Sequence, residues 1–376
     1  MQPYPVLIVG GTGAFGSRIA ELLRRGDAFA LVLGGRNRAA LDALADAMAR
    51  DGKARPRVLT LDAETATGAE VAASGAALVI NASGPFQGAG YALARAAIAA
   101  GRHYVDLADG RAFVKDFPAL DAAAKAAGVL VLSGASSVPG LSSAVVAHVQ
   151  DSFAAVQTID IAISPGNAFD PGVATVRAVL GGVGQPLSVF RDGTWETVYG
   201  WQGLRRGDFG AAGRRWLGHV AVPDLDLFPA HVPGVRTVRF QAGLEVSLFH
   251  LGLWAASWLV RCGAVRSLAP LAPSLLALKR RLHRLGSDAG GMTVEIGGVA
   301  HTGEPKLVRW ELVATHGDGP YVPALASVAI ARRLASGAET GTGARACYMA
   351  VALPDILAEA DGLAIRASFE EKPLPR

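Results

Sequence analysis

Short apolar runs alternate with helix-type spacing along the N-terminal third of the chain. Residues 6–11 form an apolar run that ends in glycine, and after it Phe15, Ile19, Leu22 and Leu23 recur at helical spacing. The first pattern is typical of a buried strand and the second of an amphipathic helix. A strand, a tight turn and a helix are therefore predicted to open the chain.

The same alternation continues to about residue 137, with turn residues between the segments. Further strands are predicted at 29–36, 57–63, 77–86, 103–110 and 129–137, and further helices at 37–52, 67–75, 90–101 and 117–128. Six buried strands joined by five helical crossovers predict a doubly wound parallel sheet with helices on both faces, the Rossmann architecture of the α/β class.

The second half of the chain has a different pattern. Strands are predicted at 157–164, 188–201, 235–243, 292–298 and 306–319, with a helix at 172–184. Alternating polar and apolar residues broken by Gly, Asp and Pro are typical of a mostly antiparallel sheet. We therefore expect a Rossmann domain at 1–148 and an α+β substrate or dimerisation domain at 149–320, with an apolar helical insertion at 246–285. Residues 321–376 are expected to return to the Rossmann domain.

A glycine motif lies at the first predicted turn. Gly11-Thr12-Gly13-Ala14-Phe15-Gly16 fits GxGxxG, which alone is a weak signal but becomes specific between a strand and a helix. In such a motif Gly11 permits the turn, Gly13 lets backbone N–H groups approach a pyrophosphate, and Gly16 packs the helix against the strand. No Lys-Ser/Thr follows, which excludes an ATP-type phosphate loop. All six residues of the motif are predicted to bind a dinucleotide.

The end of the second predicted strand selects the cofactor. NAD enzymes usually place Asp or Glu there, whereas an arginine favours the 2′-phosphate of NADP(H). Here Arg36, Asn37 and Arg38 occupy the position, so NADP(H) is predicted, with a solvated helix start as the alternative. Asp62, after the third strand, is a candidate partner of the adenine, or else a turn former.

Composition and missing motifs exclude several other classes of protein. The chain has 376 residues, 51% of them hydrophobic, with a net charge of +4, and has no basic stripe for nucleic acid. No YxxxK, HExxH or GxSxG motif occurs, and Cys262 and Cys347 form no zinc pattern, so no metal is expected. The N-terminus does not resemble a signal peptide, and a cytoplasmic location is expected.

Three segments resemble the saccharopine dehydrogenase-like oxidoreductases, in particular the bacterial proteins with a saccharopine dehydrogenase NADP-binding domain. They are GGTGAFG, NASGPFQGAGYALARAAIAAGRHYVDLADGRAFV and SGASSVPGLSSAVV. The resemblance is strong over residues 5–148 and thinner beyond. It implies NADP(H) and hydride transfer to or from a C=N, C=O or conjugated C=C bond. It also places Asn81, Gly84, Pro85 and Phe86 near the ribose and nicotinamide.

The acid–base groups are harder to place. Amine-oxidising members of that family use a lysine and a histidine, and neither Lys279 nor Lys306 lies in a matching motif. Alternation along 103–110 puts Tyr104 and Asp106 on one side of a strand, where either could supply a proton to the substrate. Asp106 could instead hold a loop, and Arg111 could bind an anionic group.

Residues 246–260, VSLFHLGLWAASWLV, are apolar without a charge. As a helix they rise about 22 Å, short of the roughly 30 Å of a bilayer core, so a spanning helix is not expected. Downstream, an apolar stripe with basic flanks is formed by Leu271, Leu275, Leu278, Leu282 and Leu285. The two helices could pack against the second sheet or form a homodimer interface, line a tunnel for a lipophilic substrate, or attach peripherally to the inner membrane surface.

Together these features predict an NADP(H)-dependent oxidoreductase that reduces an apolar carbonyl, imine or enoyl substrate. The alternative is a non-catalytic NADP(H)-binding sensor, or a scaffold associated with lipid or membrane.

Overall fold

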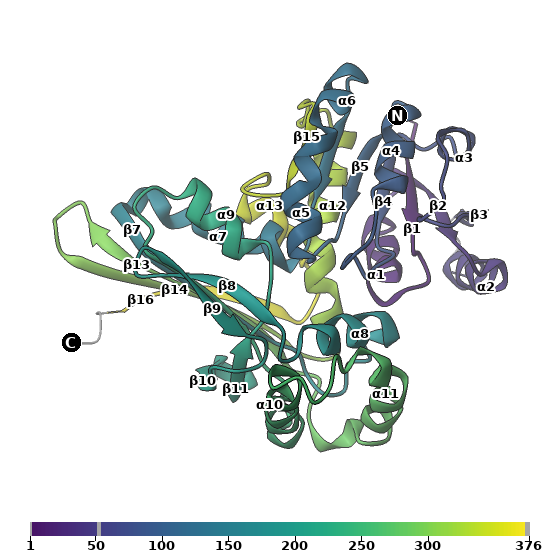
Figure 1. Cartoon of the computed structure of the whole chain (residues 1–376). Coiled ribbons are helices and arrows are strands. Elements are labelled where there is room, and N and C mark those ends of the chain that lie inside the picture. The colour runs from purple at the N-terminus through teal and green to yellow at the C-terminus, as the bar shows by residue number, and fades with distance from the viewer. Residues whose placement is uncertain (1, 51–53, 373–376) are drawn as a thin grey trace. The chain divides into compact units, whose positions relative to one another are not determined.

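The computed structural model describes residues 2–50 and 54–372 and divides the chain into two compact units (Figure 1). The first unit comprises Met1–Leu141 and Pro323–Asp361, and the second comprises Ser142–Val322 and Gly362–Arg376. The C-terminal segment, predicted to return as a whole to the Rossmann domain, is thus divided between the two units.

The first unit is built on a parallel sheet of seven strands in the order β15-β6-β5-β4-β1-β2-β3. The strands are β1 (Tyr4–Val9), β2 (Phe29–Gly35), β3 (Arg57–Thr60), β4 (Leu78–Asn81), β5 (His103–Asp106), β6 (Leu130–Ser133) and β15 (Gly343–Ala346). The run from β3 to β6 has the 3-2-1-4-5-6 order of a dinucleotide-binding fold, in which the strand order reverses between β1 and β4. The predicted α/β class is therefore confirmed.

Helices occupy the crossovers of this sheet. They are α1 (Ala14–Leu23), α2 (Arg38–Ala49), α3 (Gly68–Ala73), α4 (Ala92–Ala99), α5 (Arg111–Asp116) and α6 (Asp121–Ala126), followed late in the chain by α12 (Val322–Ala335) and α13 (Leu353–Ala358). Two of these helices have N-terminal caps formed by local side chains. The Asn37 side chain accepts a hydrogen bond from Ala40 N at the start of α2, and Thr67 forms a capping box with Glu70 at the start of α3. These bonds satisfy backbone N–H groups that a helix start leaves without partners.

The elements of the first unit that were not predicted include helix α5 and strand β15. Helix α5 has six residues, too few for a periodic pattern, and it is held by burial of Phe113 and Val114. Strand β15 has the sequence GARA, which carries no apolar run, and it forms by pairing in parallel with β6. In both cases tertiary contacts outweigh a weak local preference.

The second unit contains a mixed sheet of nine strands, with the path β10-β11-β12-β7-β13-β14-β16 and β8 and β9 branching from β12. The strands are β7 (Phe153–Ser164), β8 (Pro186–Arg191), β9 (Thr194–Tyr199), β10 (Arg205–Asp208), β11 (Arg214–His219), β12 (Thr237–Ala242), β13 (Gly290–Ala300), β14 (Pro305–Ala314) and β16 (Ile365–Lys372). Pairing is antiparallel except between β7 and β12, which confirms the expected mostly antiparallel sheet.

The helices of the second unit are α7 (Ser142–Val149), α8 (Gly172–Gly182), α9 (Asp224–His231), α10 (Ser247–Arg261) and α11 (Ala272–Arg281). Helices α10 and α11 form the predicted apolar insertion, and their inner sides pack in a core cluster with Leu180, Val183 and Trp201. In the described parts of the chain, every helix is too short or too polar to cross a membrane.

Candidate functional site

The turn between β1 and α1 lies where the strand order of the first sheet reverses. Gly10 has the left-handed conformation there, with φ of 81°. A Cβ on Gly10 would lie 2.8 Å from both Ala82 C and Ser83 N, in the loop after β4. The turn that we predicted for Gly11 therefore depends on Gly10, because only glycine has both this backbone freedom and this clearance.

The other glycines of the motif have distinct surroundings. A Cβ on Gly16 would lie 2.2 Å from Gly10 O, so α1 can pack this closely against the turn only with glycine at this position. Thr12 and Gly13 are exposed, whereas Ala14 and Phe15, in the first turn of α1, are half-buried. The outward side of the turn thus presents backbone with small side chains, as a closely bound phosphate requires.

The start of α1 also fits an anion. Gly13 occupies the N-cap position, where no side chain accepts a cap hydrogen bond, and the first turn of α1 holds no acidic residue. The helix dipole at such a terminus favours negative charge. The turn and this helix start together fit the pyrophosphate of a dinucleotide.

The residues after β2 differ in whether their side chains are free to bind a phosphate group. The guanidinium of Arg38 bonds Asp42 Oδ2 at 2.7 Å, and Asn37 caps α2. Arg36 is exposed and has no hydrogen-bond or ion-pair partner in the described parts of the chain. Of the predicted residues, Arg36 is therefore the cation open to a 2′-phosphate. Asp62 accepts a hydrogen bond from Glu64 N at 3.0 Å, as a turn former does.

The loop after β4 is organised by Asn81. Its Nδ2 donates to the Tyr104 hydroxyl at 3.0 Å, and its Oδ1 accepts from Ser83 N at 3.1 Å and from Ser83 Oγ at 2.5 Å. Gly84 and Pro85 are exposed, whereas Phe86 is buried with its ring centroid 5.3 Å from that of Phe113. The exposed Gly84 and Pro85 are thus placed to touch a cofactor, while Asn81 and Phe86 hold the loop in shape.

Asp106 is the centre of a buried network. It is 0% exposed, and its Oδ1 accepts hydrogen bonds from Ala108 N, Ser133 Oγ and Gly134 N at 3.0, 2.9 and 2.8 Å. Burial raises the pKa of the Asp106 carboxyl to about 6, although these hydrogen bonds oppose the shift. The carboxyl thus ties the loops after β5 and β6 together, the structural alternative we gave for it.

Tyr104 is equally buried. Burial, and then the negative charge of Asp106, raise the pKa of its hydroxyl well above the usual value. A group that delivers a proton to substrate has to come within hydrogen-bond reach of it. The geometry therefore gives no support to Tyr104 or Asp106 as the proton donor, and it assigns both to the interior of the fold.

A different carboxyl reaches the surface at this edge of the sheet. Asp109, three residues past the end of β5, has an exposed side chain whose Oδ1 accepts from Gln87 Nε2 at 3.0 Å, in the loop after β4. Burial among surrounding atoms nevertheless raises its pKa. Asp109 was not among the residues singled out from the sequence, because Asp109 and Gly110 form an Asp-Gly pair, which is a common turn signal.

The two lysines considered for amine chemistry have structural partners. Lys279 Nζ donates to Asn167 O and Phe169 O at 2.6 and 2.5 Å, and Lys306 Nζ lies 3.0 Å from Glu371 Oε1. The described residues contain no group of three or more His, Cys, Asp and Glu side chains that could hold a metal ion.

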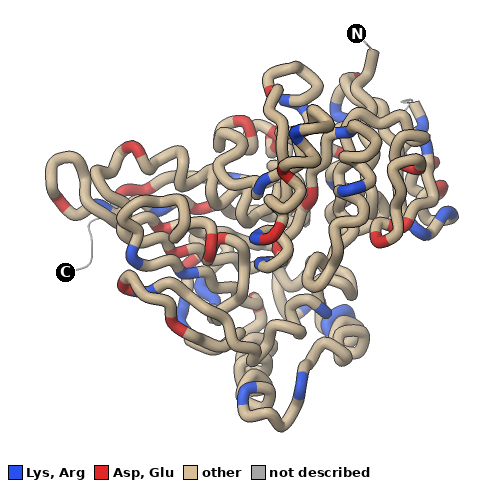
Figure 2. Tube along the Cα trace, turned by 45° about the horizontal axis from the view of Figure 1, so that its top comes forward, with Lys and Arg blue, Asp and Glu red and all other residues tan. Residues whose placement is uncertain are grey.

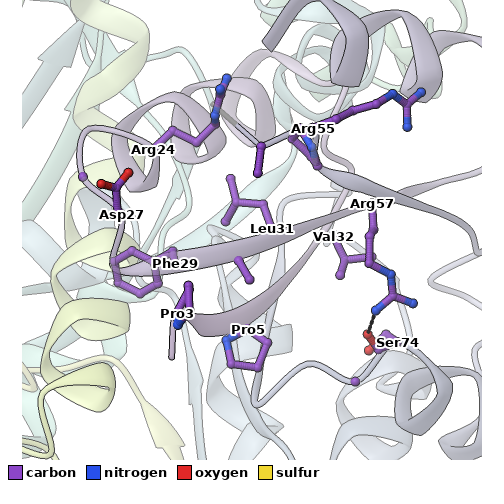
Figure 3. A pocket seen from close by; sticks show the side chains of 15 residues that line it. Pro3, Pro5, Arg24, Asp27, Phe29, Leu31, Val32, Arg55, Arg57 and Ser74 are labelled. Carbon is purple, nitrogen blue, oxygen red and sulfur yellow. Dashed lines mark hydrogen bonds between the residues drawn. The ribbon is translucent and has the colours of Figure 1, made fainter. Parts of the chain in front are cut away.

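A pocket of about 280 Å³ lies in the first unit at the opposite ends of the strands (Figure 3). Its walls include Pro5, Phe29 and Arg57, which stand at or near the amino ends of β1, β2 and β3. Ligands of open α/β sheets bind outside the carboxyl ends. This pocket is therefore separate from the dinucleotide site.

Comparisons with known proteins agree with this geometry. Residues 6–132 match the family model described as the saccharopine dehydrogenase NADP binding domain. The fold is similar to that of an apo, histidine-tagged saccharopine dehydrogenase (L-Glu forming) from Saccharomyces cerevisiae, with a TM-score of 0.70 at 15% identity, covering 98% of this chain and 100% of that chain. A lower similarity, with a TM-score of 0.43 at 16% identity, covers 99% of this chain and 97% of GenD2 from gentamicin A biosynthesis, solved in complex with NAD. No curated protein matches the sequence.

Proposed function

We propose that the protein is an NADP(H)-dependent reductase of an apolar carbonyl, imine or enoyl substrate, because residues 6–132 match the model of the saccharopine dehydrogenase NADP binding domain. The cofactor, when bound, supplies the hydride. The observation that carries the proposal is the exposed glycine turn at the strand switch point, with Arg36, which has no partner among the described residues, at the end of the neighbouring strand.

The chain's own contribution to the site comes from the loops at the carboxyl ends of the strands. The turn at Gly13 and the start of α1 bind the pyrophosphate, and Arg36 binds the 2′-phosphate. Asp109 is the candidate group that exchanges a proton with the substrate, because it is exposed at this edge of the sheet and its pKa is raised above that of a free aspartate.

Cys262 is an exposed free thiol, which supports placing the protein in a reducing compartment such as the cytoplasm.

The test is NADPH oxidation with a panel of enones, ketones and imines. Turnover should fall by about a hundredfold or more in Asp109→Asn, the size expected for loss of a general acid. Asp116→Asn, which removes an exposed carboxyl from α5 of the same unit, should leave turnover unchanged. Equal turnover in the wild type and Asp109→Asn would remove Asp109 from the mechanism.

A non-catalytic NADP(H) sensor is the second candidate. It is favoured by the burial of Tyr104 and Asp106, which leaves neither of the two predicted proton donors with access to a substrate. Tight NADPH binding without turnover of any substrate in the panel would support the sensor over the reductase.

A further inference from the structure

Helix α10 buries two polar side chains and exposes two of its leucines. His250 and Ser257 are fully buried, and Ser257 Oγ accepts a hydrogen bond from Gln202 Nε2 at 3.1 Å. By contrast, Leu248 is 73% exposed and Leu259 is 52% exposed. A helix at a water-facing surface usually has the reverse arrangement.

The exposed side of α10 is one continuous apolar face. Leu248, Gly252, Ala255 and Leu259 follow each other at steps of four, three and four, and all four are exposed. Residues at this spacing lie on one side of a helix. Trp258, which is 46% exposed, widens the face.

The segment that follows α10 also exposes apolar side chains. Leu271, Leu278 and Leu285 belong to the stripe predicted from the sequence and are exposed, whereas Ala272 and Leu276 face the core. The expectation that this stripe packs against the sheet is therefore wrong for these three leucines. Exposed side chains also do not line an enclosed tunnel, so the apolar surface needs a different partner.

The charge of the segment has one sign. Residues 246–287 contain no Asp or Glu, and in Figure 2 the helices at the lower end of the molecule show blue without red. Three of the six cations of this segment have partners: Arg261 lies 4.1 Å from the Tyr199 ring centroid, Lys279 donates to backbone carbonyls, and Arg280 bonds Asp170 Oδ2 at 2.7 Å.

The other three cations are Arg266, Arg281 and Arg284. They are exposed, and their side chains have no hydrogen-bond or ion-pair partner in the described parts of the chain. Exposed leucines and a tryptophan interspersed with such arginines are the composition of a segment that lies in the headgroup region of a bilayer.

We infer that the α10–α11 surface, defined as the exposed side chains of residues 246–287, is a docking surface for an anionic lipid bilayer. The leucines enter the boundary between headgroups and acyl chains, while the arginines contact lipid phosphates. This inference does not depend on the proposed reaction, because it concerns a surface of the second unit and is tested without substrate.

Charge favours a bilayer over a second copy of the chain as the occupant. In a two-fold dimer the same patch meets itself. Such a dimer would bring Arg266, Arg281 and Arg284 of the two copies together, and their positive charges would repel each other. Anionic lipid headgroups instead offer negative charge to these arginines.

The test is co-sedimentation of the full chain with phosphatidylcholine vesicles, with and without phosphatidylglycerol. Binding should require the anionic lipid and weaken by roughly a hundredfold when Arg266, Arg281 and Arg284 are changed to glutamine. The matched control changes Arg214, Arg236 and Arg366 to glutamine; these are exposed arginines of the same unit outside the segment, and binding should stay within about twofold of the wild type.

A second variant tests the apolar contribution. Leu248→Ser with Leu259→Ser should also lose binding, and circular dichroism and thermal melting would verify that the fold is intact. The inference is overturned if the wild type does not bind anionic vesicles, or if the variant at Arg266, Arg281 and Arg284 binds them as well as the control variant does. A dimer that the leucine variant abolishes, in a protein that does not bind vesicles, would identify a second copy as the partner instead.

Discussion

Replacing Asp106 with asparagine separates a structural carboxyl from a catalytic one. In Asp106→Asn the amide oxygen can still accept from Ala108 N, Ser133 Oγ and Gly134 N, while the negative charge is lost. Asp106 Oδ2, which is buried without a hydrogen-bond partner in the described residues, is replaced by an amide nitrogen. The variant should therefore fold and should bind NADPH as the wild type does.

The pKa shift of Asp106 determines how much the stability of the protein should change with pH. The pKa of Asp106 is about 6 in the folded chain against 3.8 for the free side chain, so the folded state holds the proton more tightly. The contribution of Asp106 to the free energy of unfolding is present at low pH and is lost as the pH rises through about 4 to 6. The total loss is about 3 kcal/mol. About half of this loss falls between pH 5 and pH 8.

The assay is urea unfolding near pH 5 and near pH 8, followed by hydrogen exchange of peptides from β5 and β6 so that the first unit is observed. The destabilisation caused by Asp106→Asn should be about 1.4 kcal/mol larger at pH 5 than at pH 8, because only the wild type gains from the bound proton. Asp116→Asn, at an exposed position, should show no such difference. An equal effect of Asp106→Asn at the two pH values would refute a buried, titrating Asp106.

Two further predictions follow from the site and the core. Gly16→Ala would force a Cβ to within 2.2 Å of Gly10 O; this overpacking, of about 1–3 kcal/mol, should displace the turn and weaken NADPH binding at least tenfold in a fluorescence titration. Gly90→Ala, where a Cβ meets nothing within 4 Å, should bind normally, and equal affinities would show that the turn tolerates the clash. Burial lowers the pKa of His219 and His250 to about 4, so the folded state binds protons less readily; the second unit should lose up to about 3 kcal/mol per histidine as pH falls from about 6.5 towards 4. Acid unfolding of His250→Asn should be correspondingly less steep, and an unchanged slope would count against this assignment.

The sequence pattern predicted the parts of the fold that rest on local periodicity. Strands such as β1 and β4 are continuous apolar runs, and buried parallel strands need that composition. Helix α5 and strand β15 could not be found in this way, because six residues around Phe113 and the sequence GARA become ordered only through contacts with distant parts of the chain.

The sequence likewise predicted some residues of the candidate site and not others. The glycine motif and Arg36 have a fixed position relative to β1 and β2, so the sequence located them. Alternation along β5 placed Tyr104 and Asp106 on one side of the strand, but it could not tell that this side is sealed by Ser133 and Gly134 from β6 and the loop that follows. Asp109 was overlooked as a candidate because its partner, Gln87, lies in a different loop.

The measurement closest to the central claim is a fluorescence titration of the purified protein with NADPH and with NADH, repeated for Arg36→Asp and for Arg95→Asp. Arg95 is exposed on α4 and controls for the change in charge. We expect the wild type to prefer NADPH, and Arg36→Asp to weaken NADPH binding by roughly tenfold to a hundredfold, the size of a lost charge-assisted hydrogen bond. Binding of neither nucleotide by the wild type, or an unchanged preference in Arg36→Asp, would contradict the account.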